Sequence, residues 1–233
     1  MLGLPDPIRA CLFDLDGVLT QTAKVHAAAW KQMFDEYLRS RDEEFREFTD
    51  EDYEDYVDGM PREDGVRSFL KSRGIELEPS EVTKLADRQN DLVQRLITAH
   101  GVDVYVGSVR YVEAARDAGL RRAVVSSSAN TREVLRVTGI EDLFEAVVDG
   151  LTIERDGLSG KPAPDSFLAG ARELGVEPTQ AAVFEDALAG VEAGRAGGFA
   201  RVVGVDRVGH ADALRAHGAD VAVSDLAELL TAS

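Results

Sequence analysis

The sequence predicts an α/β protein in which a parallel sheet forms the core and a helical segment is inserted after the first strand. Short apolar segments, most of them rich in Val, alternate with helical patterns over much of the chain, as in βαβ units. Between residues 22 and 102 this alternation stops and only helical patterns occur. Together these observations predict a Rossmann-like parallel sheet core with an inserted all-helical cap domain.

The first expected strand is residues 8–15, an apolar run that ends in an acidic residue and a glycine turn. Four further short apolar segments are expected to be strands, at residues 122–127, 146–149, 181–186 and 201–205. Helical patterns separate them, at residues 109–118, 130–137, 164–174 and 187–196. Parallel neighbours then require right-handed crossovers, with helices on both faces of the sheet.

The inserted segment contains helical patterns at residues 23–38, 62–72 and 80–99. We expect residues 1–21 and 103–233 to form the α/β core and residues 22–102 to form the cap. Ligands of open parallel sheets bind outside the carboxyl ends of the strands. An insert that leaves from the end of the first strand is therefore expected to act as a lid over such a site.

The net charge of −17 argues against nucleic-acid binding, because phosphate backbones need a basic face. A small phosphorylated substrate needs only a local positive site. Much of the acid lies in one stretch, which we interpret as a solvated helix face or a loop, because its spacing fits no calcium loop. The acidic residues of this stretch, offset there only by Arg46, are Asp42, Glu43, Glu44, Glu47, Asp50, Glu51, Asp52, Glu54, Asp55 and Asp58.

No apolar run approaches the roughly 20 residues that cross a bilayer, and the segment from Met1 to Arg9 lacks the pattern of a secretory signal. The single Cys11 lies in an apolar run and can form no internal disulfide. A buried, inert thiol in a reducing compartment is the favoured interpretation. We therefore expect a cytoplasmic protein with no nucleic-acid or membrane partner.

The strongest chemical signal is the pair Asp14 and Asp16, which leaves the first expected strand just before Gly17. Two carboxylates aimed at one small volume repel each other unless a cation or a shared proton intervenes. Mg²⁺ suits such a site, because it prefers oxygen ligands. One acid could then attack phosphorus while the other moves protons. Taken alone, the pattern is also compatible with an exposed polar loop after a strand.

Four motifs extend this signal: FDLDGVL from Phe13, SSS from Ser126, GKPAPD from Gly160 and FEDALAG from Phe184. Their order and spacing resemble those of the haloacid dehalogenase superfamily, and the resemblance covers nearly the whole chain. Segments around and within the insert resemble the β-phosphoglucomutase-like subgroup of that superfamily. These segments are LDGVLTQTAKVHAAAW, GMPRED, RQND and DVYVG.

The resemblance implies a Mg²⁺-dependent phosphoryl-transfer site. Asp14 would be the covalent nucleophile and a metal ligand. Asp16 would be the general acid and base, and its backbone carbonyl would also bind the metal. Asp186 would be a further metal ligand, with Glu185 as a ligand or a close neighbour of the ligands. Acids that favour the start of a helix are the alternative interpretation of this last pair, and both interpretations can hold at once.

The same resemblance implies that Ser126 and Lys161 hold the transferring phosphoryl group. A lone lysine is more often a surface charge, but Lys161 lies in the GKPAPD motif between an expected strand and an expected helix. There it would supply positive charge where the phosphoryl oxygens gather negative charge. Residues 157–162 lack the full P-loop pattern, which argues against a nucleoside triphosphate site.

Substrate contacts are implied both in the insert and after the second expected strand. His26 and Trp30 are one helical turn apart and share a face with Thr22. A packed core histidine is the alternative for His26, and a surface arginine is the alternative for Arg62. The nine residues to which the resemblance assigns these contacts are Thr22, His26, Trp30, Gly59, Arg62, Gln89, Ser127, Ser128 and Asn130.

The chain departs from the resembled enzymes at two positions. Gln89 stands where their lid presents a lysine, and Ala129 follows Ser128 in the core. A glutamine can hydrogen-bond a sugar hydroxyl but brings no charge. These changes leave the predicted site of the transferred group intact and bear on which sugar phosphate is bound.

The function implied is that of a phosphohexose mutase. It would convert β-glucose 1-phosphate to glucose 6-phosphate through an aspartyl-phosphate and a hexose 1,6-bisphosphate. The alternative is a Mg²⁺-dependent phosphatase of small sugar phosphates on the same fold, since only the attacking group differs. A non-catalytic sugar-phosphate-binding protein is a remote alternative. The expected partner is a small phosphorylated sugar, and the protein is expected to act as a monomer.

Overall fold

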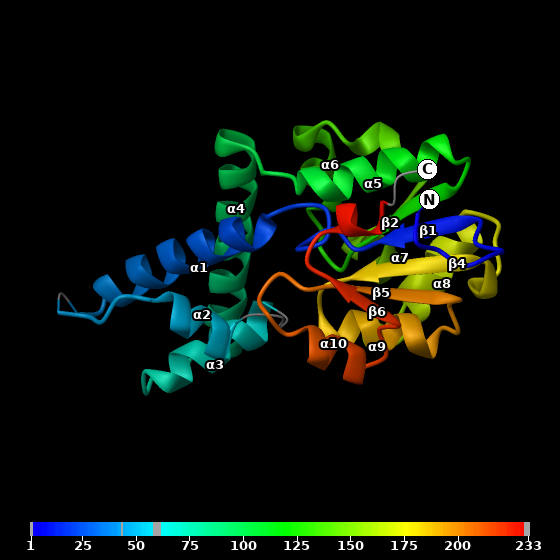
Figure 1. The fold of residues 1–233 in the computed structure, drawn as a ribbon. Helices are drawn as coiled ribbons and strands as arrows, with labels where there is room; N and C mark the ends of the chain where they lie inside the picture. The colour runs from blue at the N-terminus through cyan, green and yellow to red at the C-terminus, as the bar shows by residue number, and fades with distance from the viewer. Residues whose placement is uncertain (1, 43, 58–61, 231–233) are drawn as a thin grey trace. The chain divides into compact units, whose positions relative to one another are not determined.

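The protein is described by a computed structural model, which covers residues 2–42, 44–57 and 62–230. Contacts within the chain divide it into two compact units (Figure 1). One unit, the α/β unit, consists of Met1–Thr22 and Val102–Ser233. The other, the helical unit, consists of Ala23–Gly101.

A sheet of six parallel strands, in the order β3-β2-β1-β4-β5-β6, forms the centre of the described part of the α/β unit. Phe13 lies opposite Val124 of one neighbouring strand and Phe184 of the other. Because the strands are parallel and in this register, the residues that follow β1, β2 and β4 meet at one edge. The strands are β1 (Ala10–Phe13), β2 (Arg121–Val125), β3 (Ala146–Val148), β4 (Ala181–Glu185), β5 (Arg201–Val205) and β6 (Val221–Val223).

Helices pack against both faces of the sheet, which is why most strand residues are buried apolar side chains. On one face, Leu12 and Val183 pack with Phe167. On the other face, the Phe13 ring stacks on Phe184 with centroids 4.5 Å apart, and Tyr111 meets both rings. The helices are α5 (Val106–Asp117), α6 (Thr131–Thr138), α7 (Gly150–Arg155), α8 (Asp165–Glu173), α9 (Leu188–Ala196) and α10 (Ala211–Ala216), with 3₁₀ turns at Glu141–Leu143, Pro178–Gln180 and Leu226–Leu229.

The predicted fold class is confirmed, with all five expected strands present, but three short elements differ from the expectation. The strand β6 and the helices α7 and α10 of the α/β unit, which are three to six residues long, were not predicted, whereas the three-residue strand β3 was. The presence of α7 also corrects the surroundings of Lys161. This residue lies between two helices, α7 and α8, and does not directly follow a strand.

The helical unit contains α2 (Asp50–Tyr56), α3 (Arg62–Ser72), α4 (Pro79–His100) and all but the first residue of α1 (Thr22–Arg39). Its core is aromatic. The Phe34 ring stacks on Trp30 at 5.1 Å and lies 4.2 Å from Phe69, and Phe48 joins both phenylalanines. Trp30, Met33 and Phe34 recur at helical spacing, which places all three on the buried side of α1.

One acid of the acidic stretch, Asp52, is buried, which corrects our interpretation at that residue. Asp52 is 2% exposed and is the third residue of α2. Its carboxylate accepts hydrogen bonds from the Thr49 backbone (3.0 Å), from Arg46 (3.0 Å) and from Arg73 (2.7 Å). The buried Asp52 thus closes a capping box and anchors two arginines, whereas Asp50, Glu51 and Asp55 are exposed.

Among the helices of the described residues, none has both the length and the apolar character needed to cross a bilayer.

Candidate active site

Asp14 and Asp16 follow β1 at the edge of the sheet where β2 and β4 also end. The Asp14 backbone N–H donates to the Phe184 carbonyl (2.9 Å), which extends the β1–β4 pairing by one residue and fixes the Asp14 backbone. The Asp16 carboxylate accepts a hydrogen bond from the Thr22 hydroxyl, and its second oxygen lies 3.5 Å from the Ser126 hydroxyl. The two carboxylates are therefore held by different partners, although they are only two residues apart in the chain.

Gly17 is required by this loop for two reasons. Its φ is +80°, a conformation that side chains other than hydrogen rarely adopt. A Cβ atom at this position would also lie 1.8 Å from Oδ2 of Asp186. The glycine therefore lets the Asp186 carboxylate approach the backbone of the Asp16 loop.

Asp14, Glu185 and Asp186 form a cluster in which one ligand oxygen from each lies within 4.8 Å of the others. Burial, with the nearby carboxylates and against the pull of Lys161, raises the pKa of Asp14 to about 8. Burial and the neighbouring carboxylates also raise the pKa of Asp186 well above its ordinary value. A divalent cation would relieve this crowding of negative charge. These oxygen donors therefore fit a hard divalent metal ion.

Lys161 supplies the positive charge inside this cluster. Its ammonium donates to Oδ1 of Asp14 and to Oε1 of Glu185, both at 2.6 Å, and to the Val125 carbonyl at 3.2 Å. Burial lowers the pKa of Lys161, but the two carboxylates outweigh this effect and raise it, so the side chain remains a cation. The Phe167 ring lies 4.8 Å from the nitrogen and closes one side of its pocket.

Glu185 is the last residue of β4, and its carboxylate is held at the start of α9. It is 1% exposed, and its second oxygen, Oε2, accepts from the Ala187 N–H at 2.9 Å. A Cβ atom on Gly190 would lie 1.8 Å from Oε1 of Glu185, so the first turn of α9 approaches the carboxylate closely. The acidic pair is thus both a part of the carboxylate cluster and an acceptor at the entry to a helix.

The serine segment after β2 brings Ser126 to the same edge. The Ser126 N–H donates to the Val148 carbonyl (3.0 Å), and its hydroxyl accepts from the Ser128 N–H (3.1 Å). The Ser128 hydroxyl in turn accepts from the Asn130 N–H (3.1 Å). Ser126 and Asn130 are buried and Ser127 is exposed, and the hydrogen bonds from the backbone to the two serine hydroxyls fix this segment with the Ser126 hydroxyl in the interior.

Of the predicted substrate contacts in the insert, Thr22 lies in the α/β unit and reaches Asp16. Trp30 is 4% exposed and stacks on Phe34, so its ring belongs to the core of the helical unit. His26 is half-buried and Arg62 is exposed. Gln89 is 1% exposed, and its side-chain nitrogen has no hydrogen-bond partner among the described residues. Gly59 lies outside the described residues.

Arg207 is a residue of this region that the sequence prediction missed. It lies in the loop after β5, and its side chain donates to the carbonyl groups of Gly17 (2.8 Å) and Val18 (3.2 Å). No catalytic motif marks it. The available signal was its position just after a strand of the parallel sheet, at the edge where ligands bind.

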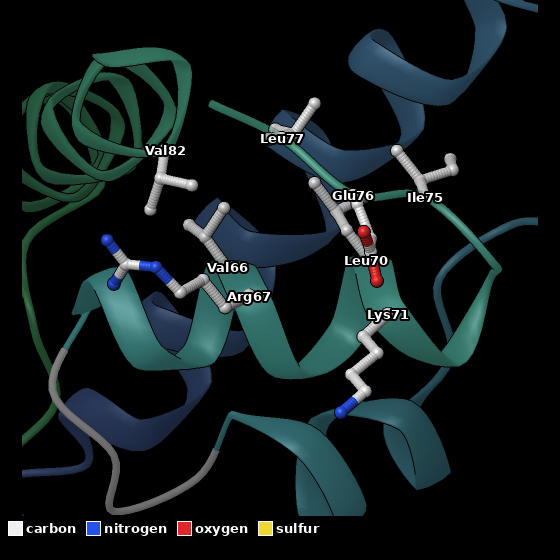
Figure 2. A pocket seen from close by; sticks show the side chains of 8 residues that line it. All are labelled: Val66, Arg67, Leu70, Lys71, Ile75, Glu76, Leu77 and Val82. Carbon is white, nitrogen blue, oxygen red and sulfur yellow. The ribbon is translucent and has the colours of Figure 1, made fainter. Parts of the chain in front are cut away.

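A separate hollow of about 240 Å³ lies within the helical unit, between α3 and α4 (Figure 2). Figure 2 shows apolar side chains from α3, from α4 and from the connecting segment around it. The lining contains none of the predicted site residues. It consists of Val66, Arg67, Leu70, Lys71, Ile75, Glu76, Leu77 and Val82.

Comparison with known proteins places this geometry in a family. A family model described as haloacid dehalogenase-like hydrolase matches residues 8–198. A protein named β-phosphoglucomutase from Mycobacterium tuberculosis is 56% identical, over 99% of this chain and 94% of the relative. A β-phosphoglucomutase from Bacillus subtilis is 34% identical over 82% of this chain and 81% of the relative.

A solved structure of a haloacid dehalogenase family hydrolase from Deinococcus radiodurans, with bound phosphate and sodium, shares the fold. It has a TM-score of 0.74 and 30% identity, and the match covers 97% of this chain and 94% of that one. The acids after β1 and β4 and the lysine that joins them lie within the segment that the family model matches. From the motifs, the fold and these relatives it follows that the chain belongs to the haloacid dehalogenase-like hydrolases, in the β-phosphoglucomutase-like subgroup.

Proposed function

We propose that the protein is a phosphohexose mutase that converts β-glucose 1-phosphate to glucose 6-phosphate. The observation that carries this proposal is the buried Asp14 carboxylate, bound by Lys161 and crowded by two further acids. The similarity to two proteins named β-phosphoglucomutase supports the choice of substrate.

In the proposed reaction Asp14 carries the phosphoryl group between the two sugar positions. Phosphorylated Asp14 gives its phosphoryl group to the 6-hydroxyl of the sugar 1-phosphate, and Asp16 takes the hydroxyl proton. The resulting 1,6-bisphosphate then presents its other phosphate. Asp14 attacks that phosphorus, the bond to the sugar oxygen breaks, and Asp16 returns the proton to this oxygen. The hydrogen bond from the Thr22 hydroxyl keeps the Asp16 carboxylate oriented for both proton transfers.

We propose Mg²⁺ as the cation, held by Asp14, Asp186 and the backbone carbonyl of Asp16, with Glu185 as a ligand or a close neighbour. When bound, the ion neutralises charge on the phosphoryl oxygens. Lys161 adds a fixed positive charge from the protein itself and favours the ionised form of Asp14 that attacks phosphorus. Ser126 donates a hydrogen bond to the phosphoryl group.

We further propose that residues 22–102 act as a lid that excludes water from the aspartyl-phosphate. In this proposal His26, Arg62 and Gln89 contribute to substrate binding from the lid, and Ser128 and Asn130 contribute from the core. The contacts that the resemblance implies for Thr22, Gly59 and Ser127 belong to the same proposal. Trp30, whose buried ring stacks on Phe34, is proposed to support the lid from its core and not to contact the substrate. A cytoplasmic monomer with a small phosphorylated sugar as its partner fits the single free Cys11 and the acidic composition.

A phosphatase is the second candidate, and Gln89 is the observation that favours it. An uncharged, buried side chain at this position binds a second phosphate less tightly than a lysine would. Water would then take the place of the sugar hydroxyl as the attacking group. A non-catalytic binding protein is disfavoured, because the nucleophile, the acid, the lysine and the metal-binding acids are all in the sequence.

One assay separates these functions. The protein is supplied with β-glucose 1-phosphate, Mg²⁺ and a trace of the 1,6-bisphosphate, and glucose 6-phosphate and free phosphate are measured together. We expect glucose 6-phosphate to exceed free phosphate by a large factor. Release of phosphate without isomerisation would reject the mutase and establish the phosphatase.

A further inference from the structure

We infer that Arg207 is a positioning residue that fixes the Asp16 loop and thereby the general acid and base. This inference rests on the proposed function only in the role that it gives Asp16. Arg207 lies 190 residues from Gly17 in the chain, and its side chain is 14% exposed. Its guanidinium meets the loop by two separate donors, since Nε donates to the Gly17 carbonyl and Nη2 donates to the Val18 carbonyl.

The other side of Arg207 is anchored to rigid parts of the α/β unit. Nη2 also donates to the hydroxyl of Ser108 (3.1 Å), which is fully buried in α5, and Nη1 donates to the Ser224 carbonyl (2.7 Å). The guanidinium lies over the Tyr105 ring at 3.5 Å. An arginine fork with this many fixed partners has one orientation, and it transmits that orientation to the loop.

The anchoring elements also hold the other end of the same loop. The Tyr105 N–H donates to the Leu19 carbonyl (2.9 Å), and Thr20 forms a β-bridge with Val104. The turn that follows Asp16 is thus held by Arg207 at Gly17 and Val18 and by residues 104–105 at Leu19 and Thr20. Without Arg207, the Gly17 and Val18 carbonyls lose these donors. The turn then keeps its internal hydrogen bonds, such as that from the Gly17 N–H to the Thr20 carbonyl (2.9 Å), and its attachments at the two ends.

The nearest charge to the guanidinium is weakly placed for an ion pair. The Asp225 carboxylate is 3.8 Å from Nη1, and that acid is itself 39% exposed. Most of the hydrogen bonds of Arg207 instead go to backbone carbonyls and a hydroxyl. A lysine could offer its charge but not the two diverging donors. We therefore attribute the role to the shape of the fork and not to its charge.

A comparison of leaving groups tests this inference. The sugar oxygen needs a proton from Asp16 when it leaves, whereas the acetate of acetyl phosphate leaves without one. Arg207→Gln should lower the turnover of the sugar phosphate about 10- to 100-fold, with KM changed by less than about threefold, because a small misplacement of a catalytic group is that costly. Phosphorylation of Asp14 by acetyl phosphate and Mg²⁺, followed by intact mass, should fall by less than about threefold. Asp16→Asn should give the same pattern.

Two further variants separate positioning from general damage. Arg122 is also buried and also binds a backbone carbonyl, that of Leu143 (2.7 Å), but it lies at the opposite end of β2 from Ser126. Arg122→Gln should lower thermal stability and leave both reactions within about twofold of wild type. Arg207→Lys keeps the charge but not the diverging donors, so it should not recover sugar turnover.

Milder variants keep the test open if Arg207→Gln does not fold. Tyr105→Leu removes the ring beneath the guanidinium and should lower sugar turnover about threefold, whereas Tyr105→Phe keeps the ring and should not. Equal loss of both reactions in Arg207→Gln, or sugar turnover within twofold of wild type, would overturn the inference. If the wild-type protein is not phosphorylated by acetyl phosphate, the proposed nucleophile fails instead, so the two failures are distinguishable.

Discussion

Asp14 combines two properties that conflict unless the site is completed by a cation. It is 7% exposed among other acids, and this environment raises its pKa to about 8. It is also directly bound by Lys161, which favours the ionised and nucleophilic form. At the scale of a single residue, the reactivity of Asp14 therefore depends on the balance between repulsion by the neighbouring acids and attraction by Lys161.

Asp14→Asn should abolish turnover, by at least about 1,000-fold, because an amide oxygen cannot form the covalent intermediate. Turnover and the phosphorylated protein detected by intact mass provide the measurements. Asp117→Asn is a suitable control, since the Asp117 side chain is 72% exposed on α5 and should leave activity unchanged. Phosphorylation of the Asp14→Asn protein at another residue would show that we have assigned the wrong nucleophile.

Gly17→Ala should inactivate the protein more severely than its size suggests. The new Cβ atom would overlap Oδ2 of Asp186, and the φ of +80° would be strained. We expect turnover to fall at least about 100-fold while most of the fold is kept. Gly74→Ala shares the positive φ but meets nothing within 4 Å, so it should lower stability alone. Comparable turnover in the two variants would contradict the close approach of Asp186.

At the scale of single elements, α7 is held at its start by one carboxylate. Asp149 is 1% exposed and accepts from the N–H and the hydroxyl of Thr152, both at 2.8 Å, and from Arg132 at 2.8 Å. Burial raises the pKa of Asp149, but these hydrogen bonds outweigh it, and the pKa lies below its ordinary value. The ionised form is thus the one that the folded protein stabilises.

Asp149→Ala should lower the free energy of unfolding by about 1–2 kcal/mol at pH 7, as for the loss of a helix cap. Because the folded-state pKa is depressed, this contribution is present above the unfolded value of about 3.9 and is lost as pH falls through the lower folded value. Urea unfolding of both proteins from pH 7 down to about pH 3 would show the two stabilities converging. A difference that stays constant over this range would contradict the sign.

In the helical unit, Asp52 stabilises the start of α2 much as Asp149 stabilises the start of α7. Asp52→Ala removes the capping box of α2 and the partner of Arg73, whose side chain is 15% exposed. We expect a loss of about 2–3 kcal/mol in the free energy of unfolding. Asp55→Ala, on an exposed position of the same helix, should stay within about 0.5 kcal/mol of wild type. If Asp52→Ala and Asp55→Ala lost equally little free energy of unfolding, the contacts of the Asp52 carboxylate would not contribute to stability.

Features that depend on neighbouring residues could be predicted from the sequence, whereas features that depend on contacts with residues far along the chain could not. The strands before Asp14 and Glu185 could be predicted, because each combines an apolar run with acids at its end. Burial of Asp52 could not, since it depends on Arg73, 21 residues away. Arg207 was missed for a related reason. Its partners at the site are backbone carbonyls, which every residue has, so no motif records them.

At the scale of the whole molecule, the site joins parts of the chain that are far apart. Asp14 follows β1, Asp186 follows β4, and Lys161 comes from the segment between α7 and α8. The acids meet because parallel strands bring their carboxyl ends to one edge, and the Lys161 ammonium reaches Asp14 and Glu185 there. A cation bound there would link the residues after β1 to those after β4. Its binding free energy would therefore add to the stability of the folded α/β unit.

Mg²⁺ should therefore raise the thermal stability of the protein, and a chelator should remove the increase. Above the dissociation constant, each tenfold rise in free Mg²⁺ adds about 1.4 kcal/mol. With a net charge of −17, any salt stabilises somewhat by screening, so ionic strength must be matched with NaCl.

Asp186→Asn should lose most of the Mg²⁺ response and be more stable than wild type in the chelator, because one of the crowded acids is gone. Asp212→Asn, at a fully exposed position, should keep the wild-type response. If Mg²⁺ raised the thermal stability of both variants equally, it would be acting on the overall charge. The carboxylate cluster would then not be the metal site.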